Sequence, residues 1–317
     1  MLNLLLAWEE FIRGKRNKKD VQEFYMNLMD NILSLHYDLS NKTYSHGGYE
    51  EFNISDPKPR IINKASVRDR LLHHAVYRIL YPFFEQKFIS DSFSCRDEKG
   101  THRALERFTY FYGKVSRNKT RTSWVLKCDI KKFFHSISHQ TLSKILEECI
   151  PDRDIINLLR EIIISFNSGK AGVGLPLGNL TSQLFANVYM NEFDQFVKHK
   201  LKVKYYIRYA DDFVILSENK SYLNEIIPAI SNFLQNNLSL TLHPDKIYIK
   251  TLYSGVDFLG WVNFPNHKTI RNRTKNRILK RIKENRNSKT LSSYIGLLKH
   301  GNTRTVKERV LKLYAES

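Results

Sequence analysis

The stretch Val203-Lys-Tyr-Tyr-Ile-Arg-Tyr-Ala-Asp-Asp-Phe-Val-Ile-Leu-Ser217 places two adjacent acids between two apolar arms. The arms, 204–208 and 213–217, have the composition of β-strands, so the stretch predicts a hairpin with Asp211 and Asp212 at its tip. Such a tip is ordinarily filled by Asn-Gly or Asp-Gly. Two carboxylates hemmed by Tyr209 and Phe213 repel each other at short range unless a cation neutralises them. The hairpin therefore predicts a cation site.

A third acid ends a hydrophobic segment upstream of the hairpin. Residues 124–130, Trp-Val-Leu-Lys-Cys-Asp-Ile, predict a buried strand that reaches Asp129 near its end. If this strand neighbours the hairpin in one sheet, Asp129 and Asp211 share hard divalent cations, which prefer carboxylate oxygens. Two-metal phosphoryl transfer requires such a set, with ions about 3.5–4 Å apart that activate a 3′-hydroxyl and stabilise the leaving pyrophosphate. The alternative interpretation is a surface turn rich in acids.

The charge of the chain indicates a polyanionic partner. Its 317 residues are 42% apolar, enough to bury a real core, and 51 Lys and Arg against 32 Asp and Glu give a net charge of +19. From Asn266 onward there are 15 basic and 3 acidic residues, a net +12 that leaves +7 for residues 1–265. The densest run, 268–289, is typical of a helix laid along a phosphate backbone. The alternative interpretation of the run is a charged helix exposed to solvent. The alternative polyanionic partner is an anionic membrane surface.

The chain carries no pattern of a secreted or membrane-spanning protein. Its three cysteines, Cys95, Cys128 and Cys149, form no Cys-x-x-Cys pair, which favours a reducing compartment. No basic residue precedes the apolar run 2–8 and two acids follow it, so we expect an amphipathic helix rather than a signal peptide. No stretch approaches the roughly 20 apolar residues of a membrane span. We expect a cytoplasmic protein without a membrane partner.

The remaining periodicity predicts mostly helices. Helical spacing covers the first 40 residues and recurs over 67–84, 102–112, 141–166 and 180–201. Turn-forming residues dominate 41–59, a short strand-like segment follows at 60–62, and a glycine-rich turn is expected over 169–178. The basic, polar stretch 114–122 is the best candidate for a domain boundary.

The acidic motifs resemble those of reverse transcriptases. Tyr209-Ala210-Asp211-Asp212 resembles the active-site box of that family, and Asp129 with Phe134 five residues later resembles its first catalytic motif. The similarity spans Lys58 to Trp261. It implies an α+β fold shaped as a right hand, with fingers, a palm built on an antiparallel sheet, and a helical thumb. These parts are expected at 1–120 (N-terminal helices and fingers), 121–265 (palm, with a fingers-side excursion around 141–178) and 266–317 (basic helical thumb).

The resemblance also implies an RNA-directed DNA polymerase that binds template RNA, a primer with its cDNA, and deoxynucleoside triphosphates. Its two Mg²⁺ ions, for which Mn²⁺ can substitute, are expected on Asp129, Asp211 and the backbone carbonyl of Ile130, with Asp212 as the supporting third carboxylate. Lys246 matches a palm lysine proposed to protonate the leaving pyrophosphate, although a surface lysine is the alternative interpretation. The three acids and Lys246 form the predicted catalytic set.

Further positions match the substrate contacts of the family. Phe134 matches an aromatic gate that occupies the space of a ribose 2′-hydroxyl, and a core phenylalanine beside Phe133 is the alternative. Arg60 and Arg68, from 57–60 and 67–70, resemble fingers residues that hold the triphosphate. The predicted nucleotide-binding set is Arg60, Arg68, Phe134, Leu177, Gly178 and Gln183. The predicted nucleic-acid-binding set combines Tyr209 and a primer-grip hairpin with the basic run: Tyr209, Leu259, Gly260, Trp261, Arg271, Arg273, Lys275, Arg277, Lys280 and Arg281.

The stretch 174–183, Gly-Leu-Pro-Leu-Gly-Asn-Leu-Thr-Ser-Gln, departs from the usual family pattern. Retroviral and group II intron enzymes usually have Gln-Gly-x-x-x-Ser-Pro here, whereas this chain has Leu177 and Gln183. Gly178 still allows close backbone approach to a nucleotide, but an apolar side chain cannot make the hydrogen bonds of the glutamine, which lowers discrimination. Together with 100–105, Gly-Thr-His-Arg-Ala-Leu, the pattern resembles the reverse transcriptases of diversity-generating retroelements. That family copies a template RNA with errors at adenines, assisted by a small basic accessory protein.

Other functions stay open from the sequence. Bacterial reverse transcriptases used in antiviral defence share this sequence style and synthesise DNA on a non-coding RNA or without a template. Group II maturases fit less well because 317 residues leave no room for an endonuclease. Retron enzymes also fit less well, because no Val-Thr-Gly box lies near the expected thumb. A catalytically inactive nucleic-acid-binding protein would be expected to lack one of the three acids or Phe134, and all four are present. The resemblance implies the cytoplasm of a bacterial or phage-infected cell.

Overall fold

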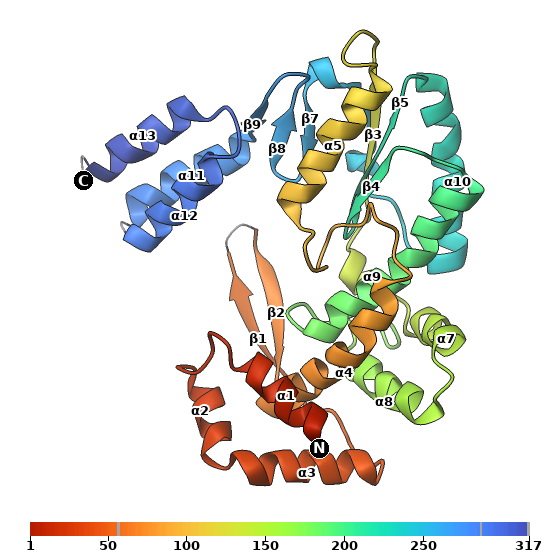
Figure 1. Ribbon diagram of the computed structural model, residues 1–317, viewed down its shortest axis with the longest axis vertical. Helices are drawn as coiled ribbons and strands as arrows, with labels where there is room; N and C mark the ends of the chain where they lie inside the picture. Colours follow the sequence, from red (N-terminus) through yellow and green to blue (C-terminus); the bar gives the residue numbers. More distant parts are fainter. Residues whose placement is uncertain (56–57, 286, 316–317) are drawn as a thin grey trace.

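Three groups of elements lie along the molecule. The computed structural model describes residues 1–55, 58–285 and 287–315, so Pro57 of the expected fingers motif, Arg286 of the basic run and the last two residues of the expected thumb lie outside the described residues. N-terminal helices and a hairpin lie at one end, a sheet with its helices lies at the other, and the C-terminal helices project to the side (Figure 1). In the described part, no helix combines the length and apolarity needed to cross a membrane.

The first 40 residues form three helices, as their periodicity predicts: α1 (Leu2–Phe11), α2 (Lys19–Met26) and α3 (Leu28–Ser40). α1 buries Leu4, Ala7, Trp8 and Phe11 and packs against the long helix α4 (Val67–Glu85). The apolar run 2–8 is therefore the amphipathic helix that the sequence predicts.

The expectation of a turn over 41–59 is wrong in its second half. Residues 49–54 form β1 (Tyr49–Ile54), which pairs antiparallel with β2 (Arg60–Ala65). The turn-forming residues flank the strand, while Phe52 and Ile54 stand opposite Ile62 and Arg60. Such cross-strand pairs outweigh the low strand propensity of the acids and the asparagine in β1. The resulting hairpin points from the N-terminal helices toward the C-terminal ones (Figure 1).

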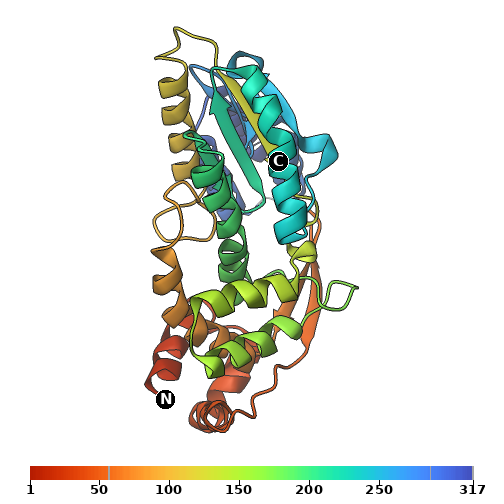
Figure 2. The ribbon, with the colours of Figure 1, turned by 90° about the vertical axis from the view of Figure 1, so that its right-hand side faces the viewer.

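A four-stranded antiparallel sheet carries the acidic motifs. Its order is β4 (Tyr206–Tyr209), β5 (Asp212–Ser217), β3 (Trp124–Asp129) and β6 (Tyr248–Thr251). The helices α9 (Leu180–Gln195) and α10 (Lys220–Leu238) cover one face, and α5 (Thr101–Val115) covers the other (Figure 2). Burial on both faces explains why the strand segments are nearly continuous apolar runs rather than alternating ones.

The expectation of one helix over 141–166 is wrong, because the segment forms α7 (His139–Cys149) and α8 (Arg153–Ile164). Pro151 has no backbone N–H and disfavours the helical conformation of Ile150. Asp152 then caps α8 by accepting hydrogen bonds from the backbone N–H groups of Asp154 and Ile155.

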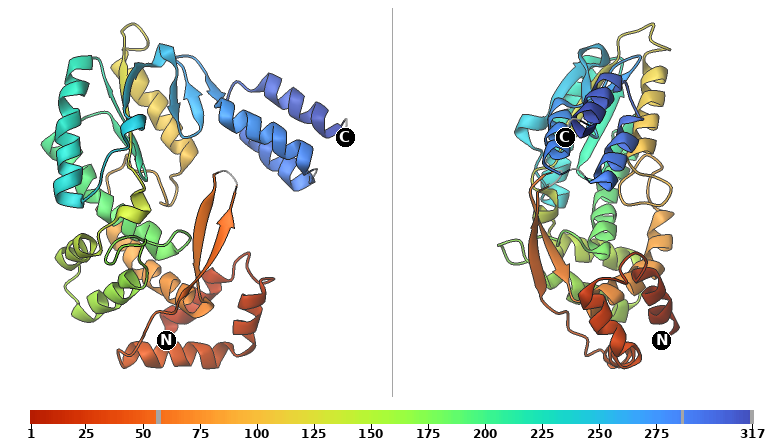
Figure 3. Two further views of the ribbon diagram at one scale, coloured as in Figure 1. Left: turned by 180° about the vertical axis from the view of Figure 1, so that it is seen from behind. Right: turned by 90° about the vertical axis from the view of Figure 1, so that its left-hand side faces the viewer.

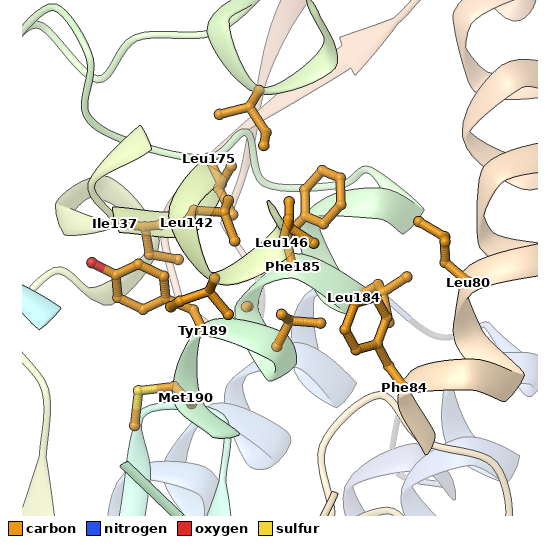
Figure 4. Close-up of a cluster of buried hydrophobic side chains, with 14 of the residues drawn as sticks. Leu80, Phe84, Ile137, Leu142, Leu146, Leu175, Leu184, Phe185, Tyr189 and Met190 are labelled. Carbon is orange, nitrogen blue, oxygen red and sulfur yellow. The ribbon is translucent and has the colours of Figure 1, made fainter. Parts of the chain in front are cut away.

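Helix α9 lies in the middle of the main core. Its seven consecutive residues 184–190 are all buried, so no face of this part of the helix is open to solvent. Figure 4 shows how α9 joins side chains of α4 and α7 in one apolar cluster: Leu80, Phe84, Leu142, Leu146, Leu184, Phe185, Tyr189 and Met190. Because α9 begins directly after the glycine-rich segment 169–178, a rigid core helix fixes the end of that loop.

A three-stranded sheet leads into the C-terminal helices. It consists of β7 (Val256–Phe258), β8 (Trp261–Asn263) and β9 (Lys268–Ile270), and it is followed by α11 (Asn272–Glu284), α12 (Ser288–Leu298) and α13 (Arg304–Ala315). The expected boundary at 265 falls within this sheet, whereas the stretch 114–122, expected as the other boundary, comprises the end of α5 and most of its connection to β3. The C-terminal helices stand on the same side of the four-stranded sheet as the β1–β2 hairpin (Figures 1 and 3).

A fully buried ion pair lies beneath the β4–β5 hairpin. Arg208 and Asp194 are both 0% exposed, and the Arg208 guanidinium donates to the two Asp194 oxygens at 2.8 and 2.6 Å. The Tyr206 hydroxyl donates to the same carboxylate at 2.7 Å, and Arg208 Nη1 donates to the Ala210 carbonyl at 3.2 Å. This network connects α9 to the turn that carries the acids.

Replacing Asp194 by alanine would leave the Arg208 guanidinium buried without its carboxylate. We expect Asp194→Ala to lower the free energy of unfolding by about 3–5 kcal/mol, measured by urea denaturation. Glu147→Ala is the control, because Glu147 pairs with Arg160 at the exposed surface, and we expect a change below about 1 kcal/mol. Equal effects of the two variants would contradict the prediction.

Candidate active site

The register of the sheet brings the three acids together at one end of its two inner strands, β3 and β5. Asp129, at the end of β3, stands directly opposite Asp212, at the start of β5. The backbone N–H of Ile130 donates to the Asp211 carbonyl at 3.1 Å, so Asp211 lies beside the same strand end. The prediction that strand 124–130 and the acidic hairpin are neighbours is confirmed.

The turn between β4 and β5 is held from below. Tyr209 pairs with Asp212, which leaves Ala210 and Asp211 to make the turn, and Ala210 has a φ of 54°. This left-handed conformation is unfavourable for a residue that carries a Cβ. Because the Ala210 carbonyl accepts a hydrogen bond from the buried Arg208, the ion pair beneath the hairpin fixes the direction of both acids.

Two lysines partly neutralise the acids. Lys246, in the 3₁₀ turn η2 (Pro244–Lys246), donates to Asp129 Oδ1 at 2.8 Å, and Lys127 Nζ lies 3.0 Å from Asp212 Oδ1. The sequence reasoning missed Lys127. Its signal is the spacing of two residues from Asp129, which places both side chains on one face of β3. Three carboxylates against two ammonium groups leave one negative charge at this edge.

Burial makes ionisation of the hairpin acids unfavourable. It raises the pKa of Asp212 to about 6, because it outweighs the neighbouring Lys127 ammonium, and the charges of Asp129 and Asp211 add to the rise. The pKa of Asp211 is raised by burial and then by the Asp129 charge. A bound cation would offset this free-energy cost.

The donor set fits Mg²⁺. It consists of the oxygens that hard divalent cations prefer, from the carboxylates of Asp129, Asp211 and Asp212 and from the backbone carbonyl of Ile130. Beyond its ion pair with Lys127, the buried Oδ1 of Asp212 has no hydrogen-bond partner. Over the described residues, no three His, Cys, Asp or Glu side chains converge on one point. Mg²⁺ sites commonly use one or two carboxylates together with water and substrate phosphates.

Two of the three acids, Asp129 and Asp212, line a cleft with a volume of about 560 Å³. Basic side chains line it from the β1–β2 hairpin, from the turn before β6 and from the start of α11: Lys58, Arg60, Lys246, Arg271, Arg273 and Arg277. The pKa of Lys58 is lowered by burial and by the positive charges of Lys246 and two of the arginines. Positive walls above an acidic floor fit a triphosphate and a nucleic-acid backbone.

Some of the predicted nucleotide contacts lie outside this cleft. Arg68, in the first turn of α4, pairs with Asp38 and lies over the Tyr44 ring. Phe134, in the short helix α6 (Phe133–Ser136), is half-buried and packs edge-on against Phe133 with the ring centroids 5.3 Å apart. Gln183, in the first turn of α9, is also half-buried. Nucleotide binding by these side chains stays a prediction.

Leu177 and Gly178 contact the strand β2. The Leu177 carbonyl accepts from the Asn63 N–H at 3.0 Å, and the Asn179 side chain donates to the Asn63 carbonyl at 3.1 Å. Gly178 has a φ of 109°, and a Cβ there would lie 2.7 Å from Ile62 Cγ2. The close approach that this glycine permits in the structure is therefore to β2. No sequence pattern indicates that Asn63 and Asn179 form the hydrogen bond that joins this loop to β2.

The expected primer grip is a tight turn between β7 and β8. Leu259 and Gly260 both have positive φ, and both line the cleft with Tyr209 and Trp261. Trp261 is nevertheless only 2% exposed, because Gly301 packs directly on its ring. Within the basic run, the cleft lining includes the three arginines of 271–277, whereas Lys275, Lys280 and Arg281 lie outside it.

Comparisons with known proteins identify related sequences. The family model of reverse transcriptase (RNA-dependent DNA polymerase) matches residues 54–262. The chain is 27% identical over 290 residues to Protein YkfC of Escherichia coli (strain K12), a match that covers 78% of this chain and 71% of that protein. It is 24% identical over 271 residues to the group II intron-encoded protein LtrA of Lactococcus lactis subsp. cremoris. That match covers 64% of this chain and 44% of the intron protein, so the chain spans less than half of that relative.

Solved structures share the fold at low sequence identity. Telomerase from Candida albicans, in complex with a fragment of telomeric RNA, matches with a TM-score of 0.55 at 12% identity, over 85% of this chain and 55% of that one. Apo telomerase from Candida tropicalis, truncated from its C-terminal domain, matches with a TM-score of 0.53 at 14% identity, over 77% and 60% of the chains. The prediction of an α+β right-hand polymerase fold is confirmed.

Asp211→Asn removes a buried carboxylate whose ionisation is unfavourable in the folded protein. Burial raises the pKa of Asp211 in the folded protein above its ordinary value of 3.8. The folded protein therefore loses stability as the pH rises from 3.8 through the folded pKa, because the carboxyl ionises more readily in the unfolded chain. Without divalent ions, we therefore expect the variant to melt at a higher temperature than the wild type at pH 8, with the difference shrinking toward pH 4. Differential scanning fluorimetry at both pH values measures this.

Asp245→Asn is the matched control, because Asp245 lines the same cleft with a side chain that is 86% exposed. We expect its melting temperature to match that of the wild type. An Asp211→Asn variant that is less stable than the wild type at pH 8 would show that burial is not the dominant effect on Asp211.

Proposed function

The chain belongs to the reverse transcriptase (RNA-dependent DNA polymerase) family, and we propose that it copies a template RNA into DNA in the cleft between the β1–β2 hairpin, the palm sheet and α11. One observation carries this proposal: Asp129, Asp211 and Asp212 meet at one end of the sheet, and two of them, Asp129 and Asp212, line a cleft with basic walls. Clustered oxygen ligands below positive side chains are what nucleotidyl transfer requires. A protein that only bound nucleic acid would not need buried acids whose ionisation is unfavourable.

In this proposal, the acids hold two Mg²⁺ ions, for which Mn²⁺ can substitute. When bound, such ions would stabilise the negative charge that develops on the attacking 3′-oxygen and on the leaving pyrophosphate. Asp129 and Asp211 bind them together with the Ile130 carbonyl, and Asp212 supports the set. Lys246, whose ammonium already lies 2.8 Å from Asp129 Oδ1, gives its proton to the pyrophosphate.

The walls of the cleft position the substrates. Lys58 and Arg60 bind the triphosphate from the hairpin side, because fixed cationic donors complement its charge. Phe134 is not part of the cleft lining, and in this proposal its ring excludes a ribose 2′-hydroxyl from beside the cleft and so selects deoxynucleotides. The turn 259–261 holds the primer end, and the arginines of α11 bind the phosphates of the template and primer strands.

We further propose that copying is error-prone, as in diversity-generating retroelements. Leu177 supports this, since an apolar side chain stands where retroviral and group II enzymes usually have a glutamine. Without those hydrogen bonds, the free-energy difference between a correct and a wrong base pair at the template is smaller. This role includes a dedicated template RNA, a small basic accessory protein and a bacterial cytoplasm.

Synthesis of cDNA tests the activity. With Mg²⁺, four deoxynucleotides and a primed RNA of mixed sequence, we expect the wild type to produce complementary DNA. The double variant Asp211→Asn with Asp212→Asn should produce none, because both carboxylates are lost, while its affinity for RNA stays within about twofold of the wild type, since phosphate contacts supply most of that affinity. Asp245→Asn again serves as the control and should keep full activity. Absence of product from the wild type would overturn the proposed function.

The sequence of the product tests fidelity. We expect Leu177→Gln to lower the error rate opposite template adenines by about 10-fold, the effect of one added hydrogen bond of about 1.4 kcal/mol. Leu33→Gln, on the exposed face of α3, should leave the error spectrum unchanged. Faithful copying by the wild type, or a product unrelated to the template, would instead favour a defence-type enzyme.

A further inference from the structure

A second basic surface lies outside the cleft, on the outer face of α5. We define the α5 surface as Arg103, Arg107, Tyr110, Lys114, Lys204 and Tyr205. Helix α5 lies in an outer layer of the described part of the molecule in two perpendicular views (Figures 1 and 2). Arg103, Tyr110, Lys114 and Lys204 are exposed, Tyr110 by 53%.

Cations and aromatic rings alternate across the α5 surface. Residues 103, 107, 110 and 114 are three or four apart and share one helix face. The Arg107 guanidinium lies 5.3 Å from the Tyr110 centroid and 4.3 Å from that of Phe111, and Lys114 Nζ lies 5.4 Å from Tyr110. Phe111 meets Tyr205 edge-on at 5.2 Å. Lys204 Nζ, 5.4 Å from the Tyr205 ring, continues the series onto the segment before β4.

Acids neutralise only part of this surface. Asp91 lies below it, 2.7 Å from Arg107 Nε and 3.9 Å from Lys198 Nζ, and Glu106 lies 3.4 Å from Arg103. The segment 198–204, Lys-His-Lys-Leu-Lys-Val-Lys, adds four lysines and no acid. Within the described parts of the chain, Lys114 and Lys204 have no acidic partner within 4.0 Å. Their charge is available to a ligand.

The surface begins at the edge of the cleft. Thr101, the first residue of α5, lines the cleft and donates from its hydroxyl to the Tyr209 hydroxyl at 3.3 Å. From there the helix runs outward for 15 residues, about 22 Å at 1.5 Å per residue. A hollow of about 550 Å³ along its first half is lined by Arg103, Arg107 and Tyr110, together with Glu98 and Glu106. A strand that leaves the cleft at Tyr209 therefore meets the α5 surface next.

We propose that the α5 surface binds a single-stranded segment of RNA that flanks the copied part of the template. Exposed aromatic rings offer faces on which unpaired bases stack, and the cations beside them bind the backbone phosphates. An acidic protein would use the lysines but not the exposed Tyr110 face. The proposal rests on the proposed function, because it assigns the bound strand to the template.

The test compares two primed templates with the same copied sequence, one without flanking nucleotides and one with an unpaired extension of about 15 nucleotides. We expect the full-length wild type to bind the extended template about 10-fold more tightly, because stacking and phosphate contacts add. The triple variant Tyr110→Ala, Lys114→Gln, Lys204→Gln should lose this advantage while its affinity for the short template and its nucleotide incorporation on it stay unchanged. The measurements are binding titrations at several salt concentrations and single-nucleotide incorporation.

A matched triple variant, Tyr25→Ala, Lys18→Gln, Lys144→Gln, removes one exposed tyrosine and two exposed lysines from α2, its N-terminal flank and α7. It should keep the full advantage of the extended template. Equal losses by both triple variants, or displacement of the RNA extension from the wild type by polyglutamate at equal charge, would overturn the proposal. If the wild type makes no DNA but binds the extension through these three residues, the RNA surface stands and the proposed function fails.

Discussion

The geometry of the three acids, Asp129, Asp211 and Asp212, depends on one buried ion pair, Arg208 with Asp194. Removing Arg208 and Asp194 from water is unfavourable, and the pair persists only because the remaining donors of the guanidinium are also satisfied. Beyond Asp194, the guanidinium donates to the Ser92 hydroxyl at 3.1 Å and to the Ala210 carbonyl. The Arg208 backbone is bonded on both sides to the loop 91–93. Helix α9, this loop and the acidic turn therefore meet at one side chain, and none of them can shift without leaving a buried polar group unpaired.

The acids are tolerated because this support lies outside them. Asp211 and Asp212 repel Asp129 and each other, and a free hairpin would relax by turning them into solvent. Here the turn is held from below by Arg208, while Lys246 and Lys127 offset part of the charge from the side. The sheet thus holds an unfavourable arrangement that a divalent cation would relieve. Such local strain, maintained by surrounding structure, is typical of functional sites.

The sequence predicts the elements whose reason for forming is local. The acidic hairpin, the strand to Asp129 and the N-terminal helices follow from apolar patterns within a few residues, and the structure confirms them. The missed features depend on contacts between distant segments. Lys246 meets Asp129 across 117 positions and Asn179 meets Asn63 across 116, and no local pattern encodes such pairs. The Lys246 position came from a family resemblance, whereas its hydrogen bond to Asp129 required the structure.

The link between Asn63 and the loop 177–179 connects two segments whose proposed nucleotide contacts the sequence treats separately. Arg60 begins β2, and three residues later Asn63 is held through both backbone groups by Leu177 and Asn179. Because the strand is short and its ladder regular, a movement of Leu177 would shift the hairpin and Arg60 with it. In the proposed function, selection of the base pair and binding of the triphosphate would therefore be coupled through one strand. In the proposed function, a residue at 177 would act on fidelity through the hydrogen bonds it lacks and also through where it holds the hairpin that carries Arg60.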